Sequence, residues 1–97
     1  MFLKIHRAPH ACDIVAVCDG ELINTIISDG DVKVHITEAF YGARRASDDE
    51  VREALKNAVN ANIMGERAVA IAIELGLVSR AGCIMMGSVP HALIFRL

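Results

Sequence analysis

A histidine fixed beside a proline, together with two asparagines and a glutamate, is the set of residues in this sequence best suited to ligand chemistry. Pro90 and His91 lie between two apolar segments, so we expect a rigid loop that presents the imidazole. Asn60, Asn62 and Glu66 lie at the start of an apolar helical segment. If the two segments converge, they form a small-ligand or catalytic site around His91. A neutral histidine hydrogen-bonded to the main chain explains the same residues equally well.

The start of that helical segment offers a second kind of site. The free main-chain N–H groups that follow Asn62 and Gly65 are suited to an anion. Glu66 opposes this interpretation, because its negative charge already lies at the positive end of the helix. We favour the alternative, in which an asparagine caps the helix and Gly65 permits close packing.

Two further chemistries have little support in the sequence. Cys83, Ser88 and His91 lie near one another, but no carboxylate is placed to orient the histidine, so we predict no catalytic residue and favour a protein that is not an enzyme. His6, His10 and Cys12 fall within seven residues, yet no second ligand pair follows at zinc-site spacing. We therefore expect no metal site and no cofactor.

An aromatic pair followed by two arginines is the candidate for contact with RNA. Aromatic rings and guanidinium groups stack on bases, and arginine also binds phosphate. The alternative is structural: the first ring anchors the core and the arginines pair with nearby acidic residues. The candidate residues are Phe40, Tyr41, Arg44 and Arg45.

Composition limits the classes of protein to consider. The 97 residues suit one domain spanning 1–97, and 54% of them are apolar, so we expect either a homodimer or an unusually compact monomer. The net charge of −2 disfavours nonspecific binding of nucleic acid. The longest apolar run, residues 68–73, is too short to cross a membrane. An odd number of unpaired cysteines and no visible signal peptide indicate a cytoplasmic protein.

The pattern of apolar residues indicates which elements position these side chains. Helical spacing predicts two amphipathic helices, 48–59 and 66–75, and a capping box opens the first of them at Ser47. Polar breaks are expected at 60–62 and 87–92, and the segment 21–28 fits either helix or strand. We expect an α+β single domain: a mostly antiparallel sheet of about five strands with two helices packed on one face. The strands are placed at 2–7, 13–18, 32–37, 83–86 and 93–97.

Several motifs, spread over nearly the whole chain, resemble an archaeal family catalogued as domain of unknown function 424. They are Lys4–Arg7, Ala16–Asp19, Phe40–Gly42, Asn60–Glu66, Ala68–Val69 and Val89–Ala92. The resemblance implies an archaeal cytosolic protein with an RNA-binding or translation-related role. We therefore expect a non-enzymatic binding protein with RNA or a ribonucleoprotein as its partner. The alternatives are a small-ligand protein or enzyme that uses His91, and a structural homo-oligomeric subunit.

Overall fold

A five-stranded sheet forms the centre of the molecule in the computed structural model, which describes residues 1–9 and 12–96. All neighbouring strands are antiparallel except β2 and β5, which run parallel. The expected α+β architecture with a mostly antiparallel five-stranded sheet is confirmed. In spatial order the strands are β1 (Phe2–His6), β2 (Ile14–Cys18), β5 (Asn60–Met64), β7 (Val89–Phe95) and β6 (Ile84–Met86).

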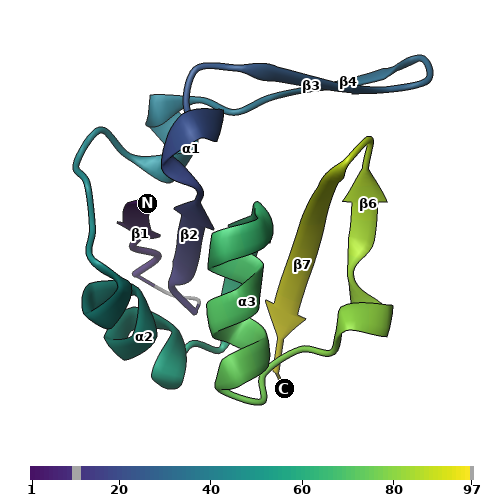
Figure 1. Cartoon of the computed structure of the whole chain (residues 1–97). Helices are drawn as coiled ribbons and strands as arrows, with labels where there is room; N and C mark the ends of the chain where they lie inside the picture. The colour runs from purple at the N-terminus through teal and green to yellow at the C-terminus, as the bar shows by residue number, and fades with distance from the viewer. Residues whose placement is uncertain (10–11, 97) are drawn as a thin grey trace.

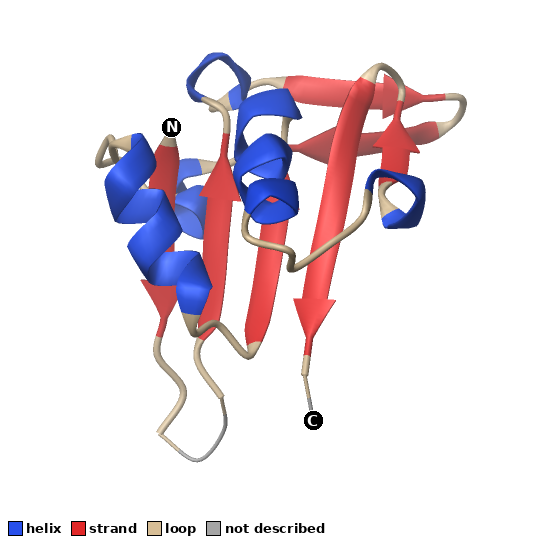
Figure 2. Ribbon diagram, turned by 60° about the horizontal axis from the view of Figure 1, so that its bottom comes forward, coloured by secondary structure: helices blue, strands red, loops and turns tan. Residues whose placement is uncertain are grey.

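Two helices cover one face of this sheet, as Figure 2 shows. They are α2 (Asp48–Lys56), which begins at a capping box between Ser47 and Glu50, and α3 (Glu66–Glu74). Apolar side chains of the two helices pack on the alternate strand residues that point toward them, because side chains alternate between the faces of a strand. This main core is the larger of two hydrophobic clusters, and it contains Val17, Leu55, Ile63 and Ile94.

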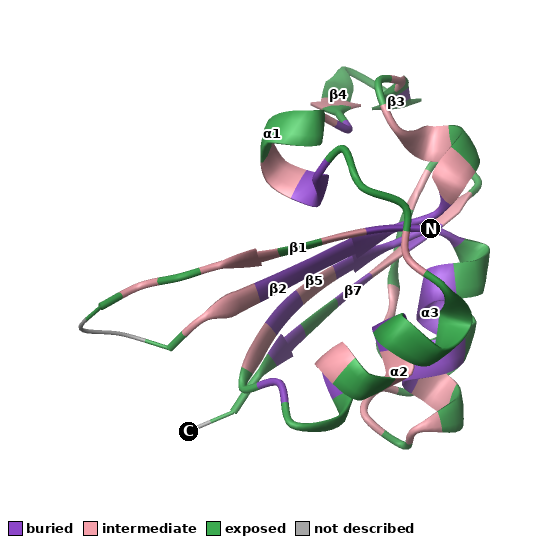
Figure 3. Ribbon diagram, turned by 90° about the vertical axis from the view of Figure 1, so that its left-hand side faces the viewer, coloured by how far each residue is buried: buried purple, intermediate pink, exposed green. Residues whose placement is uncertain are grey.

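The opposite face of the sheet is covered over its upper half only (Figures 1 and 3). Residues 20–41, which we call the cap, lie there as a 3₁₀ turn (Gly20–Leu22), the hairpin β3 (Ile26–Asp29) and β4 (Val32–His35), and α1 (Glu38–Tyr41). The cap encloses a second core. The segment 21–28, for which the sequence allowed two interpretations, is a short turn followed by a strand.

Two segments that we expected to be polar breaks are strands. Residues 60–64 form β5, the middle strand of the sheet, and residues 89–92 belong to β7. A second 3₁₀ turn (Arg80–Gly82) precedes β6. Among the described residues, no helix is long and apolar enough to cross a membrane. The consequence for function is that the asparagines and the histidine lie on the sheet itself, not on loops.

Candidate functional site

Three polar side chains meet on the face of the sheet that the cap half covers. Tyr41, the last residue of α1, donates its hydroxyl to Oδ1 of Asn62 at 2.8 Å. His91 Nε2 lies 3.0 Å from the same oxygen. Asn62 comes from β5 and His91 from the neighbouring β7, so the network joins two strands to the cap. The expected approach of His91 to Asn62 is therefore present in the structure.

The network fixes the protonation of the histidine. An amide oxygen can only accept hydrogen bonds, so the ring nitrogen that faces Asn62, Nε2, carries the proton. Burial lowers the pKa of His91, which favours the neutral ring and leaves Nδ1 as an acceptor. Burial also raises the pKa of Tyr41, so its hydroxyl stays protonated and keeps donating. The site can therefore bind a ligand by hydrogen bonds, and its groups are not arranged as an activated nucleophile.

Apolar side chains surround this network on the uncovered part of the sheet. Leu93 is 60% exposed, Phe95 73% and Ile84 58%, although all three belong to strands of the sheet. Leu93 lies directly opposite Asn62, and Phe95 opposite Asn60. We call this surface the open half-face and define it by Asn60, Asn62, Ile84, His91, Leu93 and Phe95.

Asn60 shares the open half-face with His91, but Glu66, Gly65 and Pro90, which were also predicted for this site, lie elsewhere. Glu66 opens α3 and accepts a hydrogen bond from Arg80 Nη2 at 2.9 Å. Gly65, Glu66 and Pro90 line a separate hollow of about 80 Å³ at the upper end of the sheet. A site that combines His91, Asn62 and Glu66 is therefore not formed.

Asp19, which the sequence did not single out as a functional residue, lies against the start of α3. Its carboxylate, which is only 2% exposed, accepts the N–H groups of Arg67 at 3.0 Å and Ala68 at 2.8 Å. Burial raises the pKa of this carboxyl, and the two N–H donors offset part of that effect. The carboxylate of Asp19 thus occupies the position at the start of α3 where the sequence suggested that an external anion could bind. The signal was an acidic residue directly after a buried strand.

Gly65, and not Asn62, precedes α3 as its N-cap residue, so the predicted asparagine cap is wrong. The φ angle of Gly65 is 111°, a region that favours glycine. A Cβ atom at this position would collide with the Asp19 side chain. Gly65 therefore permits close packing, as predicted, and the group that packs against it is the carboxylate of Asp19.

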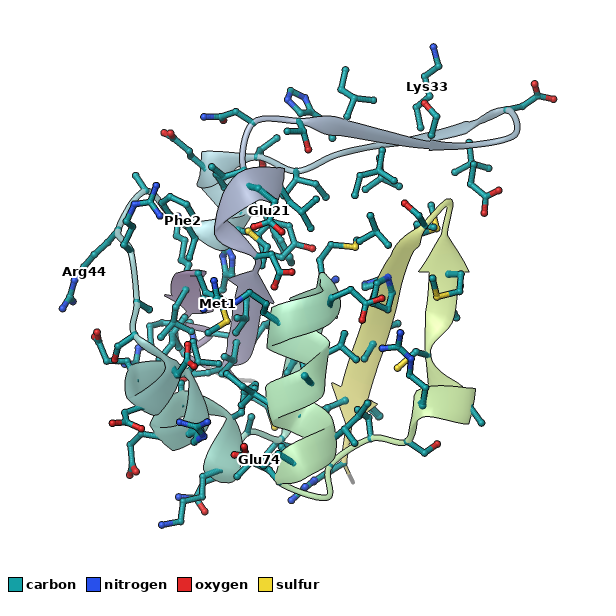
Figure 4. All side chains as sticks on the ribbon, viewed as in Figure 1. Met1, Phe2, Glu21, Lys33, Arg44 and Glu74 are labelled. Atoms are coloured by element: carbon teal, nitrogen blue, oxygen red, sulfur yellow. The ribbon has the colours of Figure 1, made fainter. Side chains whose placement is uncertain are left out.

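The aromatic and arginine loop does not form a stacking platform. Tyr41 is 4% exposed, and Phe40 is half-buried with its ring stacked on His6. The guanidinium of Arg45 lies over the Phe2 ring, 5.1 Å from its centroid. Figure 4 shows Arg44 extending away from the body of the molecule, and its Nη2 lies 3.4 Å from a carboxylate oxygen of Glu50. The two rings anchor the cap to the sheet. This arrangement favours the structural interpretation of the segment over a surface that stacks on RNA bases.

Among the residues that the structure describes, His6 and the three cysteines form no recognisable metal or catalytic centre. His6 Nε2 is hydrogen-bonded to the main-chain oxygen of Phe40 at 2.7 Å, and His10 lies outside the described residues. Within residues 1–9 and 12–96, no three His, Cys, Asp or Glu side chains are arranged to hold a metal ion. A hollow of about 310 Å³ between α2 and the lower ends of β1 and β2 is lined by Cys12, Arg7 and Asn57 among others, away from the open half-face.

Comparison with known proteins identifies a family but no activity. No curated protein matches the chain. A solved structure described as an uncharacterized conserved protein from Methanopyrus kandleri is similar to it with a TM-score of 0.82 and 26% sequence identity. The similarity covers 99% of this chain and 90% of that one. The model of a family described as protein of unknown function (DUF424) matches residues 6–97, so the chain belongs to the DUF424 family.

Proposed function

We propose that this chain is a non-enzymatic binding protein that holds a polypeptide partner on the open half-face. The observation that carries the proposal is the exposure of Leu93 and Phe95, at 60% and 73%, on a strand whose other face is buried. Apolar side chains grouped on an uncovered sheet face are typical of protein interaction sites. Asn62 and His91 add hydrogen-bonding groups at the centre of this surface.

A polypeptide fits this surface better than RNA does. The cap, which borders the open half-face, has four acidic side chains and one lysine, all of them exposed. A negative surface repels phosphate groups. Arg45 and Arg44, the arginines predicted to contact RNA, lie over Phe2 and beside Glu50. We therefore propose that the partner is a protein component of a ribonucleoprotein and not its RNA. The archaeal cytoplasm stays the predicted location of the protein.

The small-ligand alternative retains one supporting observation, the 3.0 Å contact between His91 and Asn62. An enzyme that used His91 as a base would, besides orienting the ring as Asn62 does, place a nucleophile at hydrogen-bonding distance from the free nitrogen, Nδ1. Here the oriented nitrogen, Nε2, faces Asn62, and the surroundings of the ring are apolar on the Leu93 and Ile84 side. The geometry therefore favours binding over catalysis.

The proposal is tested by affinity capture from an extract of the native cells, with and without RNase. We expect wild-type protein to retain a specific polypeptide after RNase treatment, and the Phe95→Asp variant to lose it. Met85→Asp is the matched control, because Met85 is 45% exposed on β6 and, one residue after Ile84, points to the opposite face of the sheet. Loss of the partner on RNase treatment would indicate that the protein binds RNA and not a polypeptide. Equal capture by Phe95→Asp and wild-type protein would remove the open half-face from the interaction.

The homo-oligomer alternative is checked with the same variants. Multi-angle light scattering of the purified protein at high concentration separates a monomer from a dimer. A dimer of the wild-type protein that dissociates in Phe95→Asp, but not in Met85→Asp, would identify a second copy of this chain as the polypeptide on the open half-face.

A further inference from the structure

The edge of β7 that faces away from β5 is partly unpaired. Arg96 N–H donates to the main-chain oxygen of Val59 at 2.8 Å, and Gly65 N–H donates to that of Pro90 at 2.9 Å. Residues 90 and 96 therefore point their main-chain groups toward β5. Because these groups alternate in direction along a strand, the N–H and C=O of residues 91, 93 and 95 point the other way.

The neighbouring strand on that side is too short to reach most of these groups. β6 consists of Ile84–Met86, and its register with β7 ends at the pair Ile84 and His91. Within the described residues, no strand lies beside the part of β7 that contains Leu93 and Phe95. Figure 1 shows β7 extending well below β6 on this side. The main-chain groups of both residues thus form an open edge directly beside their exposed side chains.

Open strand edges are normally shortened, charged or covered, because they pair readily with other chains. This edge is flanked by two large apolar side chains, Leu93 and Phe95. We propose that the partner polypeptide adds to this edge as an extended antiparallel strand and covers Leu93 and Phe95 with its own apolar side chains. The proposal rests on the proposed function and specifies how its partner binds. Main-chain hydrogen bonds then supply affinity, and alternate side chains supply selectivity.

The charge of the partner follows from the cap. β7 runs away from the cap, so an antiparallel segment runs toward it and must leave the sheet where β6 begins at Ile84. From there it continues along the open half-face to a cap whose four exposed acidic residues outnumber its one lysine. Charge complementarity therefore selects a segment with basic residues after its paired stretch. The acidic residues are Glu21, Asp29, Asp31 and Glu38.

Two labelled peptides test the charge. One has three threonine–valine repeats followed by two lysines, and the other has the same repeats followed by two glutamates. In fluorescence anisotropy with the full chain, we expect the lysine peptide to bind about tenfold more tightly, and the difference to shrink as salt rises. Equal binding of the two peptides, or binding of a labelled oligouridine in preference to both, would overturn the proposal.

Proline substitution tests the pairing. Leu93→Pro removes an N–H that faces the open edge and leaves the bonds to β5 intact, a position where sheets tolerate proline. Leu93→Ala is the matched control, because it removes the side chain and keeps the N–H. We expect the lysine peptide to bind about tenfold more weakly to Leu93→Pro than to Leu93→Ala. Equal affinities of the two variants would contradict strand addition.

Hydrogen exchange of the wild-type protein gives a measurement that does not depend on a variant. We expect the Leu93 and Phe95 amides to exchange rapidly in the free protein and slowly with the lysine peptide bound. The amides of Ala92 and Ile94, whose N–H groups point toward β5, should exchange slowly in both states. A bound peptide that leaves Leu93 and Phe95 unprotected would overturn strand addition but not the proposed function. The proposed function fails if Phe95→Asp captures the native partner as wild-type protein does, or if RNase removes that partner.

Discussion

Neighbouring residues on β7 have opposite surroundings on the two faces of the sheet. Ile94 is 4% exposed and packs in the main core beneath the helices, whereas Leu93 and Phe95, on either side of it, are 60% and 73% exposed. One strand thus contributes to stability with one face and presents a surface with the other. The difference supports the proposal that the open half-face binds a partner, because its apolar residues add little to the core of the folded chain.

The largest expected difference in stability is between two variants of β7 that shorten a side chain on opposite faces of the sheet. Ile94→Ala should lower the free energy of unfolding by about 2–4 kcal/mol, because it opens a cavity in the main core. Leu93→Ala should lower it by less than about 1 kcal/mol, because most of that side chain is already in water. Urea unfolding of both variants measures the difference. Equal losses would show that the open half-face contributes to stability as the helix face does.

A smaller effect is expected at the junction where Asp19 meets α3. Gly65→Ala combines a φ of 111° with a collision against Asp19, so we expect a loss of about 2–3 kcal/mol. Gly30→Ala is the control: its φ of 60° is also unfavourable, but the space around it is empty, and a loss of about 1 kcal/mol is expected. Thermal unfolding compares the two. Similar losses would mean that the close approach of Asp19 has little influence on stability.

The smallest expected effect is the contribution of His91 to the pH dependence of stability. The folded protein lowers the pKa of His91, so the unfolded chain takes up the proton first as the pH falls. The contribution of His91 to stability is therefore complete above a pH of about 6.5 and declines below it. His91→Gln should flatten the dependence of unfolding on pH between about 5 and 7. Identical pH profiles for His91→Gln and wild-type protein would contradict the lowered pKa.

Amphipathic patterns predicted the helix-covered side of the molecule well. Ser47 and Glu50 form the expected capping box, and Val51 and Leu55 from the predicted helical stripe are fully buried. The apolar segment that begins after Gly65 is α3. These features are local: each depends on residues within two turns of a helix, so periodicity alone identifies them.

The open half-face was missed because its residues contradict strand propensities. Asparagine is depleted in strands, yet Asn60 and Asn62 lie on the middle strand, where one face is polar and half-covered. Proline is unusual in a paired strand, but Pro90 lies opposite the end of β5, where it needs only to accept the N–H of Gly65. The contact of Asp19 with α3 joins residues almost fifty positions apart, which no local pattern reveals.

The one parallel pairing in the sheet constrains how the chain folds. β2 and β5 are neighbours, yet the chain between Cys18 and Asn60 leaves the sheet to build the whole cap and α2 before it returns. The β1–β2 hairpin and the unit of β5, α3, β6 and β7 can each form through nearby contacts, whereas joining them closes a long loop. We therefore expect the meeting of β2 with β5 to limit the folding rate, and substitutions along this seam to slow folding more than they speed unfolding.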